Sequence, residues 1–248
     1  MIGKATRLAR LFRSDGRAVV IALDHGQFKG AMPGLESMPE IVRRVVDGGA
    51  DGIILNAGAV ESCVPIYAGR CSLIVRVTGA STDANPAFDY HRQILSVEEA
   101  VTLGADAVIA MGFLGSAGEA PSLSLMADIA ESCRAWGMPL VAEMLVAEPS
   151  KFHDVPTIAL GARVAFELGA DVVKAYGAGE PAFAEIPKSS PLPVLVAGGA
   201  QSADPAEMAR QVIARGAAGV AFGRTVFGTE NPTQVVGSLV KVVHGKGG

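Results

Sequence analysis

Short apolar segments of strand length recur along the chain, and stretches with helical periodicity lie between them. Each segment is apolar throughout rather than alternating, which is typical of parallel strands buried on both faces. The eight segments are Ala18–Leu23, Gly52–Leu55, Ser72–Val77, Ala107–Met111, Leu140–Met144, Asp171–Lys174, Val194–Ala197 and Gly219–Phe222. Helices are expected at Pro39–Asp47, Val97–Leu103, Leu123–Trp136, Val155–Leu168, Pro205–Arg215 and Pro232–His244. This order predicts successive βαβ units.

An internal repeat supports this interpretation. A glycine-led triplet ends a predicted helix and leads directly into strands two, four, six and eight; the copies are Gly49-Ala50-Asp51, Gly104-Ala105-Asp106, Gly169-Ala170-Asp171 and Gly216-Ala217-Ala218. Glycine after a helix provides the left-handed cap of a helix-to-strand turn. Eight such strands in about 250 residues predict a (β/α)₈ barrel, with a doubly wound open sheet as the alternative. No linker-like change of composition occurs, so residues 1–248 are expected to form one domain.

The first residues, Met1 to Ser14, have a basic and apolar pattern of their own. Lys4, Arg7, Arg10 and Arg13 recur every three residues with leucines between them, which predicts a short amphipathic helix. A basic stretch without acids is also compatible with a transit peptide. We expect a helix that covers one end of the barrel.

Composition narrows the function classes. Half of the 248 residues are apolar, and 21 Lys and Arg against 25 Asp and Glu give a formal net charge of −4. Such apolar content excludes a disordered chain, and the acidic balance argues against a nucleic acid or an anionic membrane as the main partner. No apolar run reaches the roughly 18 residues of a membrane span. Three cysteines without a CxxC pair indicate a reducing compartment, so we expect a soluble, cytoplasmic protein.

Polar and glycine residues close most of the predicted strands. In a (β/α)₈ barrel the active site lies at the carboxyl ends of the strands, so these residues are expected to form one ring. They are Asp24, His25, Asn56, Arg76, Thr78, Glu143, Lys174, Tyr176, Gly198, Gly199, Gly223 and Arg224.

Lys174 is the sharpest candidate in this ring. Among seven lysines, it alone lies inside an apolar strand, after Val172 and Val173 and before Ala175. Burial disfavours an ammonium and frees a neutral amine to attack a carbonyl carbon, which is the Schiff-base route. The alternative is a structural lysine that pairs with a carboxylate or reaches solvent. A pair with Asp24 or Glu143 is compatible with catalysis, because imine chemistry needs a proton donor and acceptor nearby.

Asp24 and His25 follow the first strand. Neighbouring residues on a strand face opposite ways, so only one of them is expected to point into the site unless the strand has ended. We expect Asp24 to move protons and His25 to orient Asp24 or the substrate. The alternative is a turn with a packed histidine.

The glycines after strands seven and eight are candidates for phosphate binding. Gly198, Gly199 and Gly223 leave backbone N–H groups open, and Arg224 adds charge, at the two places where these barrels often bind phosphate. The alternative is two tight turns with Arg224 in a surface ion pair. Arg76 is either a second anion contact or the neutralising partner of a carboxylate.

These residues together resemble a known family. The segments Val20–Gly26, Asp171–Lys174, Ala197–Gly199 and Gly223–Phe227 resemble the archaeal-type class I aldolases of the DhnA/DeoC/LacD group, across nearly the whole chain. The group includes archaeal-type fructose-bisphosphate aldolase, aminodideoxyheptulosonate synthase and the autoinducer-2 phosphate thiolase. The resemblance implies a (β/α)₈ barrel, a homo-oligomer that is often a decamer, and a phosphorylated keto substrate.

The resemblance also assigns roles. Lys174 matches the Schiff-base lysine, Asp24 matches the acidic residue, and Gly198, Gly199, Gly223 and Arg224 match the phosphate-binding turns. The aldolases and the heptulosonate synthase carry a proton-donating tyrosine in a Tyr-Pro-Arg-Gly stretch after strand five, where this chain has Leu145–Glu148. Glu143 or Tyr176 is the candidate replacement.

The main hypothesis is a class I aldolase that acts on a phosphorylated ketose through Lys174, with Asp24, Glu143 and His25 in catalysis. A thiolase-like acyltransferase, a barrel isomerase that uses Asp24 and Glu143 without an imine, and a non-catalytic phosphometabolite-binding subunit are the alternatives. The chain has no metal-ligand spacing and no dinucleotide fingerprint, so no metal or cofactor is predicted.

Overall fold

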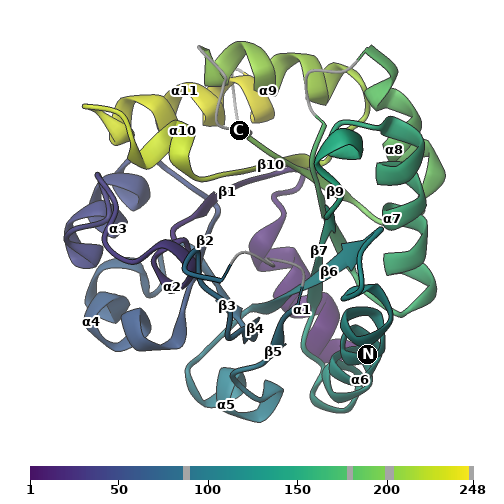
Figure 1. The fold of residues 1–248 in the computed structure, drawn as a ribbon. Helices are drawn as coiled ribbons and strands as arrows, with labels where there is room; N and C mark the ends of the chain where they lie inside the picture. The colour runs from purple at the N-terminus through teal and green to yellow at the C-terminus, as the bar shows by residue number, and fades with distance from the viewer. Residues whose placement is uncertain (86–89, 178–180, 199–203, 246–248) are drawn as a thin grey trace.

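The computed structural model describes residues 1–85, 90–177, 181–198 and 204–245. Eight parallel strands close into a barrel in the order β1-β10-β9-β8-β7-β6-β3-β2, which confirms the predicted (β/α)₈ fold (Figure 1). The barrel strands are β1 (Ala18–Ala22), β2 (Gly52–Leu55), β3 (Ser72–Arg76), β6 (Ala107–Leu114), β7 (Leu140–Val146), β8 (Val172–Ala175), β9 (Val194–Ala197) and β10 (Gly219–Phe222). A two-stranded hairpin, β4 (Thr78–Gly79) and β5 (Arg92–Gln93), was not predicted.

Helices surround the barrel (Figure 1). They are α2 (Gly26–Lys29), α3 (Met38–Asp47), α4 (Ala57–Tyr67), α5 (Val97–Thr102), α6 (Glu119–Trp136), α7 (Val155–Glu167), α8 (Glu185–Ser189), α9 (Pro205–Ala214), α10 (Arg224–Phe227) and α11 (Pro232–His244), with 3₁₀ turns η1 (Pro149–Lys151) and η2 (Pro181–Ala184). The sequence pattern missed α4, whose apolar residues are not confined to one face and which contains Pro65. Among the described helices, none is long and apolar enough to cross a bilayer.

Alternation along the strands divides the core into two layers. One face of each strand packs outward on the helices, and the other forms a cluster inside the barrel. The inner cluster contains Ala18, Val20, Ala22, Ile54, Ile74, Ala107, Ile109, Val141, Val172, Leu195 and Ala221. The next inward positions toward the carboxyl ends are Arg76, Glu143 and Lys174, so alternation places these three charged side chains in one layer above an apolar floor.

Two strands are longer than predicted. Beyond the barrel rim, β6 and β7 stay paired from Gly112 with Met144 to Leu114 with Val146. Leu145 and Val146, which were expected to follow the strand, therefore lie within it. The loop that replaces the family's tyrosine stretch begins later in the chain than predicted.

The first helix, α1 (Ile2–Leu11), lies across the amino-terminal end of the barrel, as Figure 1 shows. Leu11 is buried in the inner cluster, and Leu8 and Phe12 pack against the same cluster. The predicted cover of one end is confirmed.

The basic residues of this segment bind the aspartates of the repeated triplets. Each aspartate accepts a backbone N–H from a neighbouring strand and forms an ion pair with a basic residue of the N-terminal segment, which explains the repeat physically. The ion pairs are Lys4–Asp171 (2.9 Å), Arg10–Asp106 (3.0 Å) and Arg13–Asp51 (2.5 Å). The backbone donors are Leu140 to Asp171 (2.9 Å), Leu73 to Asp106 (3.2 Å) and Val19 to Asp51 (2.6 Å). The fourth triplet has Ala218 in this place.

We expect Asp51→Ala to destabilise the fold strongly. The substitution leaves the Val19 N–H without its acceptor and removes the carboxylate that also accepts from His244 Nε2 at 2.9 Å. The free energy of unfolding in urea should fall by about 2–4 kcal/mol. Asp47→Ala is the control, because Asp47 forms only a half-exposed pair with Arg70 and should cost less than about 1 kcal/mol. Equal losses in both variants would contradict this role of Asp51.

Candidate active site

The structure brings Lys174, Glu143 and Arg76 together at the carboxyl end of the barrel. In the ladder between β7 and β8, Lys174 lies directly opposite Glu143, so both side chains point to the barrel interior. Each of the three is at most 5% exposed. Burial of charged groups to this degree requires that they pair with one another.

Glu143 is the centre of the resulting network. Its Oε1 accepts a hydrogen bond from Lys174 Nζ at 2.6 Å and another from the Tyr176 hydroxyl at 2.7 Å. Its Oε2 accepts from Arg76 Nη2, and Arg76 Nε donates to Asp24 Oδ2. Two cations and two anions are thus held in one buried cluster, with a phenol beside the lysine.

The charges within the cluster determine its protonation states. Burial alone would raise the pKa of Asp24, but Arg76 and Lys174 outweigh it and hold that pKa below its ordinary value. Burial would likewise raise the pKa of Glu143. Lys174 and Arg76 outweigh this effect and hold the pKa of Glu143 well below its ordinary value. Burial and the Glu143 carboxylate raise the pKa of Tyr176 well above its ordinary value. At neutral pH both carboxylates are therefore ionised and the phenol keeps its proton.

The surroundings of Lys174 differ in part from the prediction. The flanking strand residues are apolar, as expected, but the amine faces a carboxylate and a phenol instead of an apolar pocket. This is the paired arrangement that the sequence left open. It gives the amine a proton acceptor at hydrogen-bond distance.

Asp24 and His25 both lie at the site because β1 ends at Ala22, before the alternation of a strand would separate them. Asn56 Nδ2 donates to the backbone oxygen of Asp24 at 2.8 Å and fixes its position. His25 is half-buried, with Nδ1 3.7 Å from Asp24 Oδ1, and burial lowers its pKa despite that neighbour. A Cβ on Gly223 would come within 2.5 Å of the His25 ring, so only glycine fits beneath the imidazole.

The predicted phosphate turns lie beside this histidine. Gly223 precedes α10, whose first residue, Arg224, is exposed and forms no ion pair with any described residue. A Cβ on Gly198 would come within 3.0 Å of Thr225 Oγ1, so the two turns are in close contact. Gly199 lies outside the described residues.

Sequence reasoning missed several polar residues at this end of the barrel. In the described part of the chain, buried polar atoms without a hydrogen-bond partner are concentrated here: His25 Nδ1, Gln27 Oε1, Asn56 Oδ1, Arg76 Nη1, Ser81 Oγ and Thr225 Oγ1. Gln27 and Thr225 were not predicted to take part in the site, and the loop that contains Ser81 was compatible with either a substrate lid or an ordinary turn. Such atoms are costly unless a polar ligand or water pairs with them, and they could have been suspected only from the loops that carry them.

His91 is a further residue that the pattern did not single out. It is buried, stacks on Phe28 with ring centroids 5.3 Å apart, and meets the edge of Phe113 at 5.0 Å. Burial, with a contribution from Arg76, lowers its pKa to about 4. His91 is therefore neutral at physiological pH and adds no charge to the cluster. The described residues contain no group of three metal-ligating side chains.

A (β/α)₈ barrel with a lysine, two carboxylates and a phenol at the carboxyl ends of its strands defines an enzyme suited to lysine chemistry on a carbonyl compound. The family model described as DeoC/LacD family aldolase matches residues 18–229. The chain belongs to this aldolase family, which confirms the resemblance seen in its motifs.

Individual relatives agree with this assignment. The 2-amino-4,5-dihydroxy-6-oxo-7-(phosphonooxy)heptanoate synthase of Streptomyces griseus is 36% identical over 251 residues, covering 98% of this chain and 91% of the relative. The 2-amino-3,7-dideoxy-D-threo-hept-6-ulosonate synthase 1 of Archaeoglobus fulgidus is 35% identical, covering 99% and 92%. An archaeal fructose-1,6-bisphosphate aldolase, solved with its catalytic lysine bound to a carbinolamine intermediate, superposes with a TM-score of 0.88 at 28% identity, covering 98% and 100%.

Proposed function

We propose that the protein makes or breaks a carbon–carbon bond in a phosphorylated keto substrate through an imine at Lys174. The observation that carries the proposal is the contact of Lys174 Nζ with Glu143 Oε1 at 2.6 Å, inside a cluster that also holds Tyr176 and Asp24. The solved relative with a lysine-bound carbinolamine supports the chemistry. The phosphonooxy group in the name of the Streptomyces griseus relative supports the substrate class.

The phosphate is proposed to bind at the turns after β9 and β10. In α10 the N–H groups of Val226 and Phe227 donate to the Gly223 carbonyl, which leaves those of Arg224 and Thr225 without an acceptor in the helix. Gly198 and Gly223 allow close approach of a ligand. Arg224 supplies a positive charge, and the Thr225 hydroxyl supplies a further donor. Gly199 belongs to this proposal on sequence grounds alone. Arg76 is better explained as the neutralising partner of Asp24 and Glu143, since two of its nitrogens bind them.

Imine formation moves two protons from the Lys174 nitrogen to the ketone oxygen. Glu143 accepts a proton from the ammonium, and the nitrogen lone pair then forms the C–N bond while the carbonyl π pair moves to oxygen. That oxygen takes a proton from Tyr176, which recovers one from Glu143 through their hydrogen bond. A second transfer along the same path releases the oxygen as water and leaves the iminium.

The iminium then accepts the electron pair of the carbon–carbon bond. Asp24, which is ionised, takes the proton of the hydroxyl group on the carbon that becomes the aldehyde. The aldehyde leaves, and an enamine stays on Lys174; the reverse sequence forms the bond. His25 is proposed to orient Asp24 and the substrate.

The protonation states disfavour an isomerase that uses Asp24 and Glu143 as an acid and base pair. Both carboxylates are held ionised by Arg76 and Lys174 in the resting site, so neither holds the proton that the general acid of such a pair must carry at the start of the reaction. The nearby group that keeps its proton is Tyr176, which contacts the same oxygen as the lysine.

Reductive trapping tests the imine directly. The protein is incubated with phosphorylated ketoses and diketones and reduced with borohydride, and its intact mass is then measured by mass spectrometry. An adduct whose mass matches a substrate or fragment supports the proposal and identifies the compound. Turnover of a ketose without any adduct would favour an imine-free reaction.

Arg224→Gln is expected to weaken binding of the phosphorylated substrate with little effect on the chemical step. Losing a charge-assisted contact to phosphate should raise KM about tenfold or more, while kcat changes much less. The same ketose without phosphate is the control, because its kcat/KM should respond little to the substitution. An equal loss for both compounds would place Arg224 outside the phosphate site.

We further propose that the protein forms a homo-oligomer, such as the decamer that the family resemblance implies, and that it acts in the cytoplasm. Leu160 and Phe166 on α7 are large apolar side chains that the monomer leaves exposed, which supports association. The free thiols of Cys63, Cys71 and Cys133 support a reducing compartment.

A further inference from the structure

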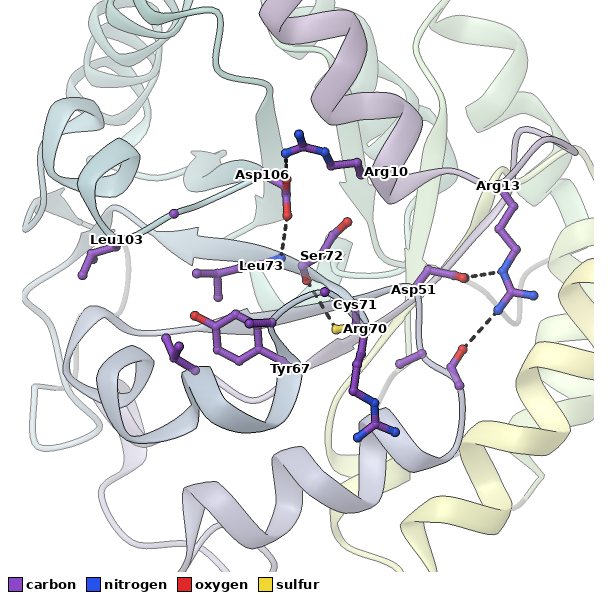
Figure 2. A pocket seen from close by; sticks show the side chains of 16 residues that line it. Arg10, Arg13, Asp51, Tyr67, Arg70, Cys71, Ser72, Leu73, Leu103 and Asp106 are labelled. Carbon is purple, nitrogen blue, oxygen red and sulfur yellow. Dashed lines mark hydrogen bonds and ion pairs between the residues drawn. The ribbon is translucent and has the colours of Figure 1, made fainter.

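The two ends of the barrel hold their arginines in different ways. At the amino-terminal end, Arg10 and Arg13 each form an ion pair with one aspartate beside a cavity, and their side chains stay in contact with solvent (Figure 2). Arg76, at the carboxyl end, is 2% exposed and donates to Asp24 through Nε and to Glu143 through Nη2. Two of its three nitrogens thus bind carboxylates, so whatever fixes the plane of this guanidinium has to act on its faces.

Phe28 contacts one of those faces. The guanidinium lies over the ring, with the carbon Cζ of Arg76 5.3 Å from the ring centroid. A guanidinium is attracted to the negative face of an aromatic ring, and the attraction is stronger where water is excluded. Both side chains are buried. The ring therefore favours one plane for the N–H groups of Arg76 without competing with the carboxylates for any of them.

His91 keeps the Phe28 ring in place. The two rings are nearly parallel, with an interplanar angle of 8° and centroids 5.3 Å apart, and the edge of Phe113 closes on His91. Because burial keeps the imidazole uncharged at neutral pH, it does not repel the guanidinium. A ring packed in this way cannot tilt without moving its neighbours, so Phe28 offers Arg76 a fixed surface.

The hairpin of β4 and β5 brings His91 to Phe28. The Thr78 hydroxyl accepts the N–H of Met111 in β6 at 2.9 Å, which anchors β4 to the rim of the barrel. In the loop that follows, the Asp83 N–H donates to the backbone oxygen of Phe28 at 2.9 Å. These contacts fold the hairpin and α2 onto each other. They give the hairpin, which the apolar pattern did not predict, a place beside the buried cluster.

We propose that Phe28 is a positioning residue that holds the guanidinium of Arg76 in the orientation from which it reaches both carboxylates of the buried cluster. Without the ring, the guanidinium can turn about its side-chain bonds, and the carboxylates lose part of their contact with its positive charge. Phe28 acts through Arg76 and needs no contact with the substrate. This role rests on the proposed function, because the two carboxylates serve catalysis only if they exchange protons at Lys174 and the substrate.

Phe28→Leu tests this role, because leucine stays apolar but offers no ring face to the guanidinium. Phe28→Met fills more of the volume of the ring, again without a ring face, and should behave alike. Phe183→Leu is the matched control, since Phe183 is also buried but belongs to the apolar layer between the barrel and its helices.

Urea unfolding at pH values from about 2.5 to 4.5 measures the effect on the carboxylates. A freer guanidinium lets the pKa values of Asp24 and Glu143 rise toward their ordinary values, so the two groups lose less stabilisation on acidification. The free energy of unfolding of Phe28→Leu and Phe28→Met should therefore fall less steeply with acid than that of the unmodified protein, while Phe183→Leu keeps the unmodified slope. The other titratable side chains that act on the two carboxylates are kept in all three variants: Lys174, Tyr176, His25 and His91.

His91 takes up its own proton in this range, because its pKa is about 4, so the comparison is repeated in the Glu143→Gln background. There Phe28→Leu should change the slope much less, since one of the two carboxylates that it affects no longer titrates. An equal change of slope in both backgrounds would overturn the proposal, as would an unmodified slope in Phe28→Leu and Phe28→Met.

Reductive trapping with dihydroxyacetone phosphate, the smallest phosphorylated ketose, links this role to the reaction. At neutral pH the trapping rate should fall about tenfold in Phe28→Leu and change less than about twofold in Phe183→Leu. Equal rates in Phe28→Leu and the unmodified protein would remove Phe28 from the reaction. Absence of an adduct in the unmodified protein would instead count against the function proposed at Lys174, and the urea slopes would still decide whether Phe28 holds Arg76.

Discussion

Replacing Lys174 with alanine is expected to abolish the borohydride-trapped adduct and to lower kcat/KM by a factor of about 10⁴ or more. The substitution removes the amine that is proposed to form the imine, and no other described lysine lies in the buried cluster. The proposed phosphate-binding turns and Asp24 are unchanged in this variant, so substrate binding is expected to persist. The measurement is intact-mass spectrometry after reduction, together with steady-state kinetics on the compound that traps in the unmodified protein.

Lys174→Arg is the companion variant. Alanine leaves Glu143 without one of its two cationic partners, which could loosen the site, whereas arginine keeps the positive charge beside that carboxylate. Both variants should lack the adduct, and the arginine variant should be nearly as stable as the unmodified protein. An adduct that persists at another lysine in a folded Lys174→Arg protein would refute the assignment.

The barrel itself could be predicted because its strands carry a strong local signal. Segments such as Gly52–Leu55 and Val194–Ala197 are apolar throughout, and their observed bounds are those expected. The extension of β7 through Val146 could not be foreseen, because it depends on pairing with β6 and not on the local pattern. The helix α4 was missed since its apolar residues do not follow one helical face.

The members of the site were easier to predict than their partners. Lys174 and Glu143 each interrupt an apolar strand, which marks them in the sequence. Their direct opposition depends on the register of two strands that lie about 30 residues apart, which no local pattern contains. The same limit applies to Thr225, which becomes notable only because the turn containing Gly198 folds against it.

The triplet repeat shows how a correct pattern can have an incomplete explanation. The glycines predicted helix-to-strand turns, and all four adopt the expected positive φ: 89° at Gly49, 77° at Gly104, 95° at Gly169 and 97° at Gly216. The aspartates that follow were not explained by turn geometry. Each of these aspartates forms an ion pair with a basic residue of the N-terminal segment, a contact that the sequence pattern alone does not contain.

Glu143→Gln is expected to have the second largest effect on activity. The amide keeps the shape of the side chain but cannot accept a proton from Lys174, so kcat should fall about 10²- to 10⁴-fold with a smaller change in KM. Tyr176→Phe removes a donor without changing the charge of the cluster, and it should also slow trapping of the imine. Unchanged trapping rates in both variants would exclude the proposed path for protons.

Glu143→Gln is also expected to change the pH dependence of the free energy of unfolding. The pKa of Glu143 lies well below its ordinary value of 4.5 in the folded protein, because Lys174 and Arg76 outweigh the effect of burial. Its ionised form therefore stabilises the fold above about pH 4.5, and this contribution is lost as the pH falls toward the lowered pKa. Glutamine has no such titration, so the free energy of unfolding of Glu143→Gln should fall less steeply below pH 4.5 than that of the unmodified protein. Urea unfolding at a series of acidic pH values measures both slopes, and equal slopes would mean that Glu143 is not held ionised by its two cations.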